Sequence, residues 1–159
     1  MDPVQLIPLL SFLHVMGAIL AFGPTFAYSI MGAMAGREPQ HANFSARQVE
    51  AIGNKLVYPL AIFQGVTGVL LIWATSIDLA AATWLGIAIV LYAVALTYGL
   101  TVQRNALLRL IELSSTAPAP GSAPSPEIPA TVRKIQRGGM FMGLLIVVIV
   151  FLMVVKPTY

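Results

Sequence analysis

The sequence predicts an all-α integral membrane protein, built as a four-helix transmembrane bundle. Of its 159 residues, 58% are hydrophobic and only 9% are charged, whereas a soluble domain carries about 25% charged residues. The apolar residues are also gathered in four runs, each comparable to the roughly 20 residues that a membrane-spanning helix needs. We therefore expect one domain over residues 1–159, with spans at about 6–35, 56–77, 80–110 and 135–155.

The composition argues against several classes of function. The chain has no cysteine, which excludes disulfides, thiolate metal sites and a cysteine nucleophile. Its net charge is only +3, and the basic residues flank apolar runs, so we interpret them as topology signals and predict no nucleic-acid partner. No Asp, Glu, Lys or Arg lies in the central part of any run, although ion-coupled transport normally uses one. The start, Met1-Asp2-Pro3, lacks the basic region of a secretory signal, so we expect no cleavage there.

On a helix, the first run has two different faces. One carries small and polar side chains, which allow close helix approach and find partners between helices, so we expect it to point into the bundle. The opposite face is bulky and apolar and suits lipid. The inward face holds His14, Ala18, Ala21, Thr25, Tyr28 and Gly32, and the lipid face holds Phe12, Met16, Ile19, Leu20, Phe26 and Ile30.

The first run also contains Gly23-Pro24. Pro24 has no backbone N–H, so the carbonyl of Leu20 loses its helical partner. We therefore expect the first helix to be kinked at Gly23-Pro24. Helix packing is sufficient reason for such a kink, because Pro and Gly are common in membrane helices.

The next two runs each offer one polar side chain that we expect to point inward. Gln64 shares a helical face with Gly68 in the second run, and Tyr92 shares one with Gly99 in the third. Pro59 suits the first turn of the second helix.

The long connections carry helix and linker signals. Ser45, with Gln48 three residues later, predicts an N-capped helix start before the second run. Residues 114–130 hold five prolines among Ser, Ala and Gly, which predicts a flexible or polyproline-like cytoplasmic linker. This linker is a plain connector or, alternatively, a segment that binds a partner.

The distribution of charge predicts the orientation of the chain. Eight of the nine Lys and Arg residues lie in the connections 36–55 and 101–137, and only Lys156 lies on the other side. By the positive-inside rule, both connections are cytoplasmic and both termini lie outside. The expected location is the inner (plasma) membrane.

His14 is the one histidine inside an apolar run, about 12 Å below the outer end of the first span at roughly 1.5 Å rise per residue. A neutral imidazole there can bind haem or a metal, or can hold two helices together by a hydrogen bond. The other histidine, His41, lies in a cytoplasmic connection, so a second haem ligand would be a methionine, Tyr92, water or a histidine of a second copy. The candidate cofactor-binding residues are therefore His14, Tyr92 and Gln64, and we predict no catalytic group and no dedicated metal site.

Several short motifs are spread over nearly the whole chain. They are Leu13-His14-Val15, Phe22-Gly23-Pro24, Lys55-Leu56 with Pro59 and Gly68, Trp84-Leu85, and Val155-Lys156-Pro157. These motifs resemble those of the CopD-like and HemJ-like four-helix membrane proteins, and the chain is most similar to a group of predicted integral membrane proteins of unknown function. In the HemJ-like branch, the first-helix histidine is implicated in haem binding and protoporphyrinogen oxidation, and His14 matches that position. That branch also uses a third-helix lysine, which the third run here lacks, while the CopD branch is associated with copper uptake.

Three functions remain open at this point. The first is a non-enzymatic membrane subunit that packs in the lipid bilayer against itself or a larger complex, supported by the small-residue faces and the lack of acid–base groups. The second is a membrane redox protein that binds haem b through His14. The third is transport of a small solute or metal. Polar groups around His14 at a cavity would favour haem or transport, and a tightly filled core would favour the subunit.

Overall fold

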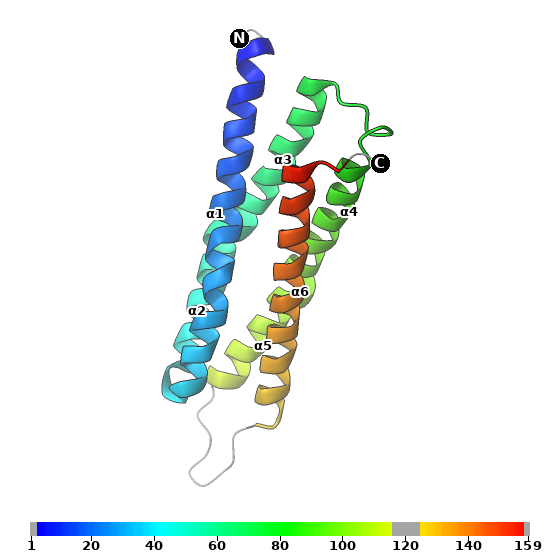
Figure 1. Cartoon of the computed structure of the whole chain (residues 1–159). Coiled ribbons are helices and arrows are strands. Elements are labelled where there is room, and N and C mark those ends of the chain that lie inside the picture. The colour runs from blue at the N-terminus through cyan, green and yellow to red at the C-terminus, as the bar shows by residue number, and fades with distance from the viewer. Residues whose placement is uncertain (1–2, 116–124, 158–159) are drawn as a thin grey trace.

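The computed structural model describes residues 3–115 and 125–157, and these residues fold as an all-α membrane bundle. Four helices in this part of the chain are long and apolar enough to span a membrane (Figure 1). The first and last described residues lie toward the same end of the bundle. The predicted fold class is confirmed.

The helices have the following bounds. The first, α1, runs from Pro3 to Arg37. The second long helix joins α2 (Ala42–Ile52), a π-turn η2 (Gly53–Val57) and α3 (Tyr58–Thr75). The third joins α4 (Thr83–Tyr98), a π-turn η3 (Gly99–Gln103) and α5 (Arg104–Ser115). The fourth, α6, runs from Glu127 to Val155. A 3₁₀ turn η1 (Pro39–His41) connects α1 to α2.

The turn between α3 and α4 is longer than the sequence predicted. Residues 76–77 and 80–82, which we had assigned to spans, lie in the connection. Ser76 has a left-handed φ of 50° that ends α3, and the Asp78 carboxylate accepts a hydrogen bond from the Ala80 N–H at 2.8 Å. This Asx-type turn competes with the helix, which explains why the apolar residues around it are not helical.

Two predictions about the connections are corrected by the structure. The helix before the second run begins at Ala42, so the predicted N-cap at Ser45 is wrong; the Ser45 hydroxyl instead donates to the Met31 carbonyl of α1 at 3.4 Å. The linker predicted over 114–130 is helical at both ends, because Ser114 and Ser115 complete α5 and residues 127–130 begin α6. Residues 116–124 lie outside the described residues.

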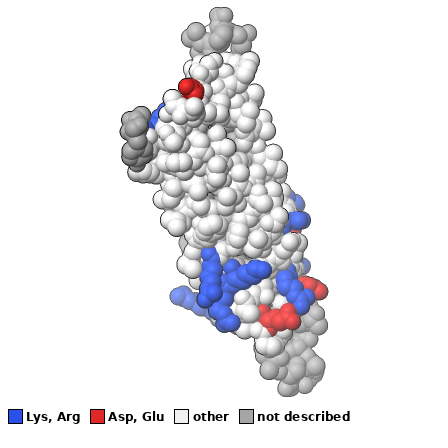
Figure 2. All heavy atoms as spheres, turned by 90° about the vertical axis from the view of Figure 1, so that its right-hand side faces the viewer, with Lys and Arg blue, Asp and Glu red and all other residues white. Residues whose placement is uncertain are grey.

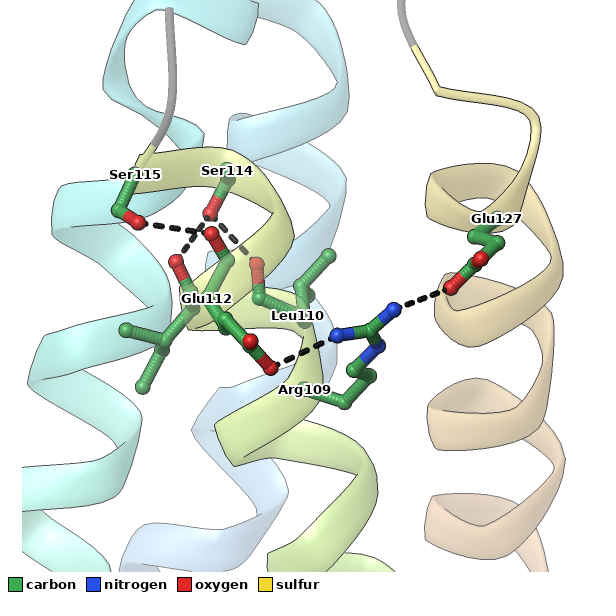
Figure 3. Close-up of polar contacts among 7 residues, drawn as sticks. Arg109, Leu110, Glu112, Ser114, Ser115 and Glu127 are labelled. Atoms are coloured by element: carbon green, nitrogen blue, oxygen red, sulfur yellow. Dashed lines mark hydrogen bonds and ion pairs between the residues drawn. The ribbon is translucent and has the colours of Figure 1, made fainter.

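An ion-pair cluster connects the end of α5 to the start of α6. Arg109 donates to the Glu112 carboxylate at 2.8 Å and to the Glu127 carboxylate at 2.7 Å (Figure 3). The three side chains are largely exposed, so water and salt screen the pairs and their net stabilisation is small. The cluster indicates the register of α5 against α6.

Proline and glycine are accommodated without breaking the long helices. At η2, the Tyr58 N–H reaches back five residues to the Gly53 carbonyl, directly before Pro59, which has no N–H to donate. Pro59 lies in the first turn of α3, as predicted. The helix α1 continues through Gly23-Pro24, and the kink there stays a prediction.

The helices pack chiefly in two pairs, α1 with α3 and α4 with α6, while α2 packs against α5. The two faces predicted for α1 are confirmed: Ala21 is completely buried, whereas Phe12, Phe26 and Ile30 are exposed. Gly32 departs from the prediction because it is exposed. It lies near the end of α1, beyond the closest contact with α3.

Basic side chains gather at one end of the bundle, and a broad uncharged surface covers the adjoining part (Figure 2). Figure 1 shows that this end contains α2, α5 and the beginning of α6. The opposite end holds Asp78, in the turn between α3 and α4, and Lys156, directly after α6. This separation agrees with the pattern on which the predicted orientation depends.

Candidate functional site

A cluster of two buried polar side chains and one half-buried histidine joins α1 to α3. Nδ1 of His14 lies 2.9 Å from Oγ1 of Thr67, and the Gln64 side-chain Nε2 lies 2.9 Å from Nε2 of the same imidazole. Gln64 and Thr67 are three residues apart and therefore share one face of α3. Only 7% of Gln64 and 2% of Thr67 is exposed. One α1 side chain thus makes two hydrogen bonds to two buried α3 side chains.

The tautomer of His14 follows from the orientation of the Gln64 amide. With its nitrogen toward the imidazole, the amide donates and Nε2 of His14 accepts. In the neutral ring the other nitrogen then carries the proton, and Nδ1–H donates to the Thr67 hydroxyl oxygen. The Thr67 hydroxyl donates in turn to the backbone of its own helix, with the Gln64 carbonyl at 3.0 Å and the Phe63 carbonyl at 3.1 Å. Both nitrogens of His14 are therefore satisfied inside the protein.

Two glycines make room for these side chains. A Cβ atom added at Gly68 would lie 3.2 Å from Cε1 of His14, which is tighter than ordinary contact. A Cβ added at Gly17 would lie 2.8 Å from Oε1 of Gln64, a distance that real Cβ atoms essentially never show. Glycine on both helices thus permits the close approach of α1 and α3 that these hydrogen bonds require.

One polar atom of the cluster has no partner among the described residues. The Gln64 amide oxygen, Oε1, is buried and accepts no hydrogen bond. It is directed toward the backbone of Gly17, where even a methyl group would not fit. The unpaired acceptor reduces the net stability that the cluster contributes, and it remains where it is because the Nε2 atom of the same amide is bonded to His14.

Tyr92 is directed to a different part of α3. Its hydroxyl donates to the Ala61 carbonyl, and a Cβ added at Gly65 would lie 3.0 Å from that hydroxyl. Tyr92 also lines an open apolar groove between α3 and α4. It therefore connects α4 to α3, on a separate contact from the cluster of His14, Gln64 and Thr67.

The sequence thus identified two of the three members of the cluster. His14 and Gln64 were predicted to point inward, and the structure brings them together. Thr67 was missed, because threonine is an ordinary residue in an apolar helix. Its position three residues after Gln64 was the available signal.

The cluster does not fit an axial haem ligand as it stands. Such a ligand needs a free lone pair on one imidazole nitrogen, and the lone pair on Nε2 of His14 accepts from Gln64. The backbone of α3 at Gly68 lies against the ring edge, so a porphyrin would have to separate α1 from α3. Among the described residues, no three His, Cys, Asp or Glu side chains lie close enough to hold a metal ion.

Comparison with known proteins places the chain in a family of membrane proteins. Residues 8–157 match the family described as predicted integral membrane protein (DUF2269), so the chain belongs to that family. No curated protein and no solved structure matches it. The finer likeness to CopD-like and HemJ-like proteins stays a resemblance.

Proposed function

We propose that the protein is a non-enzymatic membrane subunit, in which the cluster of His14, Gln64 and Thr67 fastens α1 to α3. The observation that carries this proposal is that both imidazole nitrogens are bonded to α3, at 2.9 Å each. A histidine used in this way holds two helices in register. Interhelical hydrogen bonds of this kind contribute about 0.6–2 kcal/mol each in membranes.

The packing around the cluster supports the same conclusion. Gly17 and Gly68 leave so little space that an added methyl group would press on Gln64 or on His14. Close packing of this kind is expected of a structural contact. The subunit sits in the lipid bilayer and assembles with itself or within a larger complex.

The orientation forms part of this proposal. All four long helices carry their Lys and Arg residues toward the end that holds α2 and α5, with Lys156 as the exception. The positive-inside rule then places that end in the cytoplasm and both termini outside the inner membrane.

Haem binding through His14 is the alternative, supported by the family resemblance of the first helix. An absorption spectrum of the purified protein in mild detergent, oxidised and reduced, distinguishes the two. We expect no Soret band, and no change after haemin is added, because Nε2 of His14 is engaged. The matched variants are His14→Ala and His41→Ala, since His41 lies in an exposed turn.

The two histidine variants also test the structural role directly. His14→Ala should lower the free energy of unfolding in detergent by about 1–3 kcal/mol, because it leaves buried Gln64 and Thr67 groups without partners. His41→Ala should leave stability unchanged. A Soret band that is present in the natural protein and lost only in His14→Ala would overturn the proposal in favour of haem.

A further inference from the structure

The face of α1 that points away from His14 carries an exposed apolar stripe. Its members lie within an arc of about 100° when α1 is viewed down its axis. Each of them is more than half exposed. The stripe consists of Phe12, Val15, Ile19, Phe26, Ile30 and Met34.

A ring of basic residues marks where the membrane ends at the cytoplasmic end. Lys55, Arg104 and Arg137 are the charged residues closest to the middle of the second, third and fourth long helices. A charge in the hydrocarbon core is costly, so this ring, formed by Lys55, Arg104 and Arg137, lies at the membrane surface.

Hydrogen bonds show that the members of the ring lie at about one height. The Tyr58 hydroxyl reaches the Gly99 carbonyl at 3.5 Å, joining the second long helix to the third. The Gln103 side chain donates to the Ile135 carbonyl at 3.0 Å, joining the third to the fourth. Each of these four residues is at most five positions from a member of the ring.

The same argument fixes the height of α1. Its His14 is bonded to Gln64, and α1 and α3 run in opposite directions. Lys55 precedes Gln64 by nine residues and Gly23 follows His14 by nine residues, so Gly23 lies at about the height of the ring. The part of α1 beyond Gly23 therefore projects out of the membrane beside α2.

Half of the stripe lies on this projecting part. Phe26 is 55% exposed, Ile30 is 64% exposed and Met34 is 58% exposed. From its first to its last residue the stripe extends about 33 Å at roughly 1.5 Å per residue, and it begins well inside the span. The hydrocarbon core covers only the half above the ring, so the other half is an exposed apolar surface of the kind that marks a protein contact.

We propose that a second copy of this chain covers the stripe, in a parallel α1–α1 pair with its two-fold axis along the membrane normal. Two copies inserted in the same orientation present each stripe residue at the same height, so one symmetric contact covers the membrane half and the projecting half together. This inference rests on the proposed function, because it names the partner with which the subunit assembles.

One further feature fits a second copy. Gly23 lies within the arc of the stripe and has open space where a Cβ would be, which permits two α1 helices to approach closely at the membrane surface.

The area of the stripe is comparable to that of a small specific interface. Aromatic side chains bury roughly 150–250 Å² each when fully covered, the Val, Ile and Met side chains are smaller, and all six are more than half exposed. At about 100 Å² for each side chain, the stripe offers at most about 1,200 Å² in total over two copies, at the lower end of specific interfaces.

The natural chain contains no cysteine, so a single introduced cysteine reports its own neighbours. Ile30→Cys, in the full chain in native membranes, is treated with copper phenanthroline, and the products are identified by mass. We expect a disulfide-linked homodimer as the main product. Leu108→Cys is the matched control, because Leu108 is exposed on α5 on the same side of the ring; it should remain monomeric.

A second variant tests the same contact without a cross-link. Ile30→Glu should convert the dimer to monomer in detergent while leaving the unfolding transition unchanged, since Ile30 is 64% exposed. The proposal fails if Ile30→Cys cross-links no better than Leu108→Cys, or if its main product is a disulfide to a different protein. Neither result changes the absorption spectrum of the purified protein, so the spectrum tests the proposed function separately from the dimer.

Discussion

His14 is a polar side chain in an apolar helix, and its partners determine what it can do. A buried imidazole without partners costs free energy, and one bonded at both nitrogens does not. Gln64 and Thr67 supply those two bonds from one face of α3. The price of this arrangement is the unpaired amide oxygen of Gln64.

The hydroxyl of Thr67 can be removed almost without change of shape. Thr67→Val leaves Nδ1–H of His14 without an acceptor, so we expect a loss of about 1–2 kcal/mol in the free energy of unfolding. Thr67→Ser keeps the hydroxyl and should lose less. The measurement is a denaturant titration in detergent, followed by circular dichroism. Equal stability of the Val variant and the natural protein would contradict this account.

Gly17 tests whether close approach of α1 and α3 matters. Gly17→Ala places a methyl group 2.8 Å from the Gln64 amide oxygen, so the helices must separate or the amide must leave His14. We expect a destabilisation of about 1–3 kcal/mol, as for other overpacked cores.

The matched control is Gly86→Ala on α4, where an added Cβ meets nothing within 4 Å. It should be neutral or slightly stabilising, because alanine favours helix. If both glycine variants unfolded at the same denaturant concentration, tight packing at Gly17 would not be a source of stability.

The pair of helices α4 and α6 is held by a second close approach, at Gly138. A Cβ added there would lie 2.9 Å from the Tyr98 hydroxyl and in severe overlap with the Gln103 amide oxygen. Gln103 is itself fixed by its hydrogen bond to the Ile135 carbonyl. Any larger residue at position 138 would therefore displace the Gln103 amide or the Tyr98 hydroxyl.

Adjacent glycines allow a sharp comparison at this contact. Gly138→Ala should destabilise the protein by about 1–3 kcal/mol through overpacking, whereas Gly139→Ala, with nothing within 4 Å of the added Cβ, should not. Thermal unfolding in the same detergent measures both. A larger loss for Gly139→Ala than for Gly138→Ala would show that α6 is rotated from the position described.

The sequence was most informative about features that depend on neighbouring residues of one helix. Apolar length predicted the four long helices, and the spacing of small residues predicted which face of α1 is buried. Helix ends were predicted less well, because amphipathic segments such as α2 and α5 continue the spanning helices beyond their apolar runs. The two π-turns, η2 and η3, were not predicted at all.

The site was predictable only in part for a related reason. Periodicity placed His14 and Gln64 on inward faces, but it could not show that their side chains meet, because that depends on the relative height of α1 and α3. Tyr92 also points inward, yet it bonds to the Ala61 carbonyl and not to the cluster. The buried face of a helix can be predicted from the sequence of that helix alone, whereas a contact between side chains depends on how two helices are placed.

The molecule as a whole is divided by its charge into two halves, which meet near Lys55, Arg104 and Arg137. One half, with α3, α4 and most of α6, is apolar, while α2, α5 and the first turns of α6 carry the charges. The charged half holds eight Lys and Arg against four Glu. This excess of positive charge is the physical basis of the predicted orientation.

The orientation is open to direct measurement, because the natural chain has no cysteine. Ala80 is exposed in the turn between α3 and α4, and Gln40 is exposed in the turn between α1 and α2. In intact cells, a membrane-impermeant maleimide should label Ala80→Cys and leave Gln40→Cys unlabelled until the cells are permeabilised. The cysteine-free natural protein gives the background. The reverse labelling pattern would place the eight basic residues outside, against the positive-inside rule, and would mean that another subunit determines how this chain inserts.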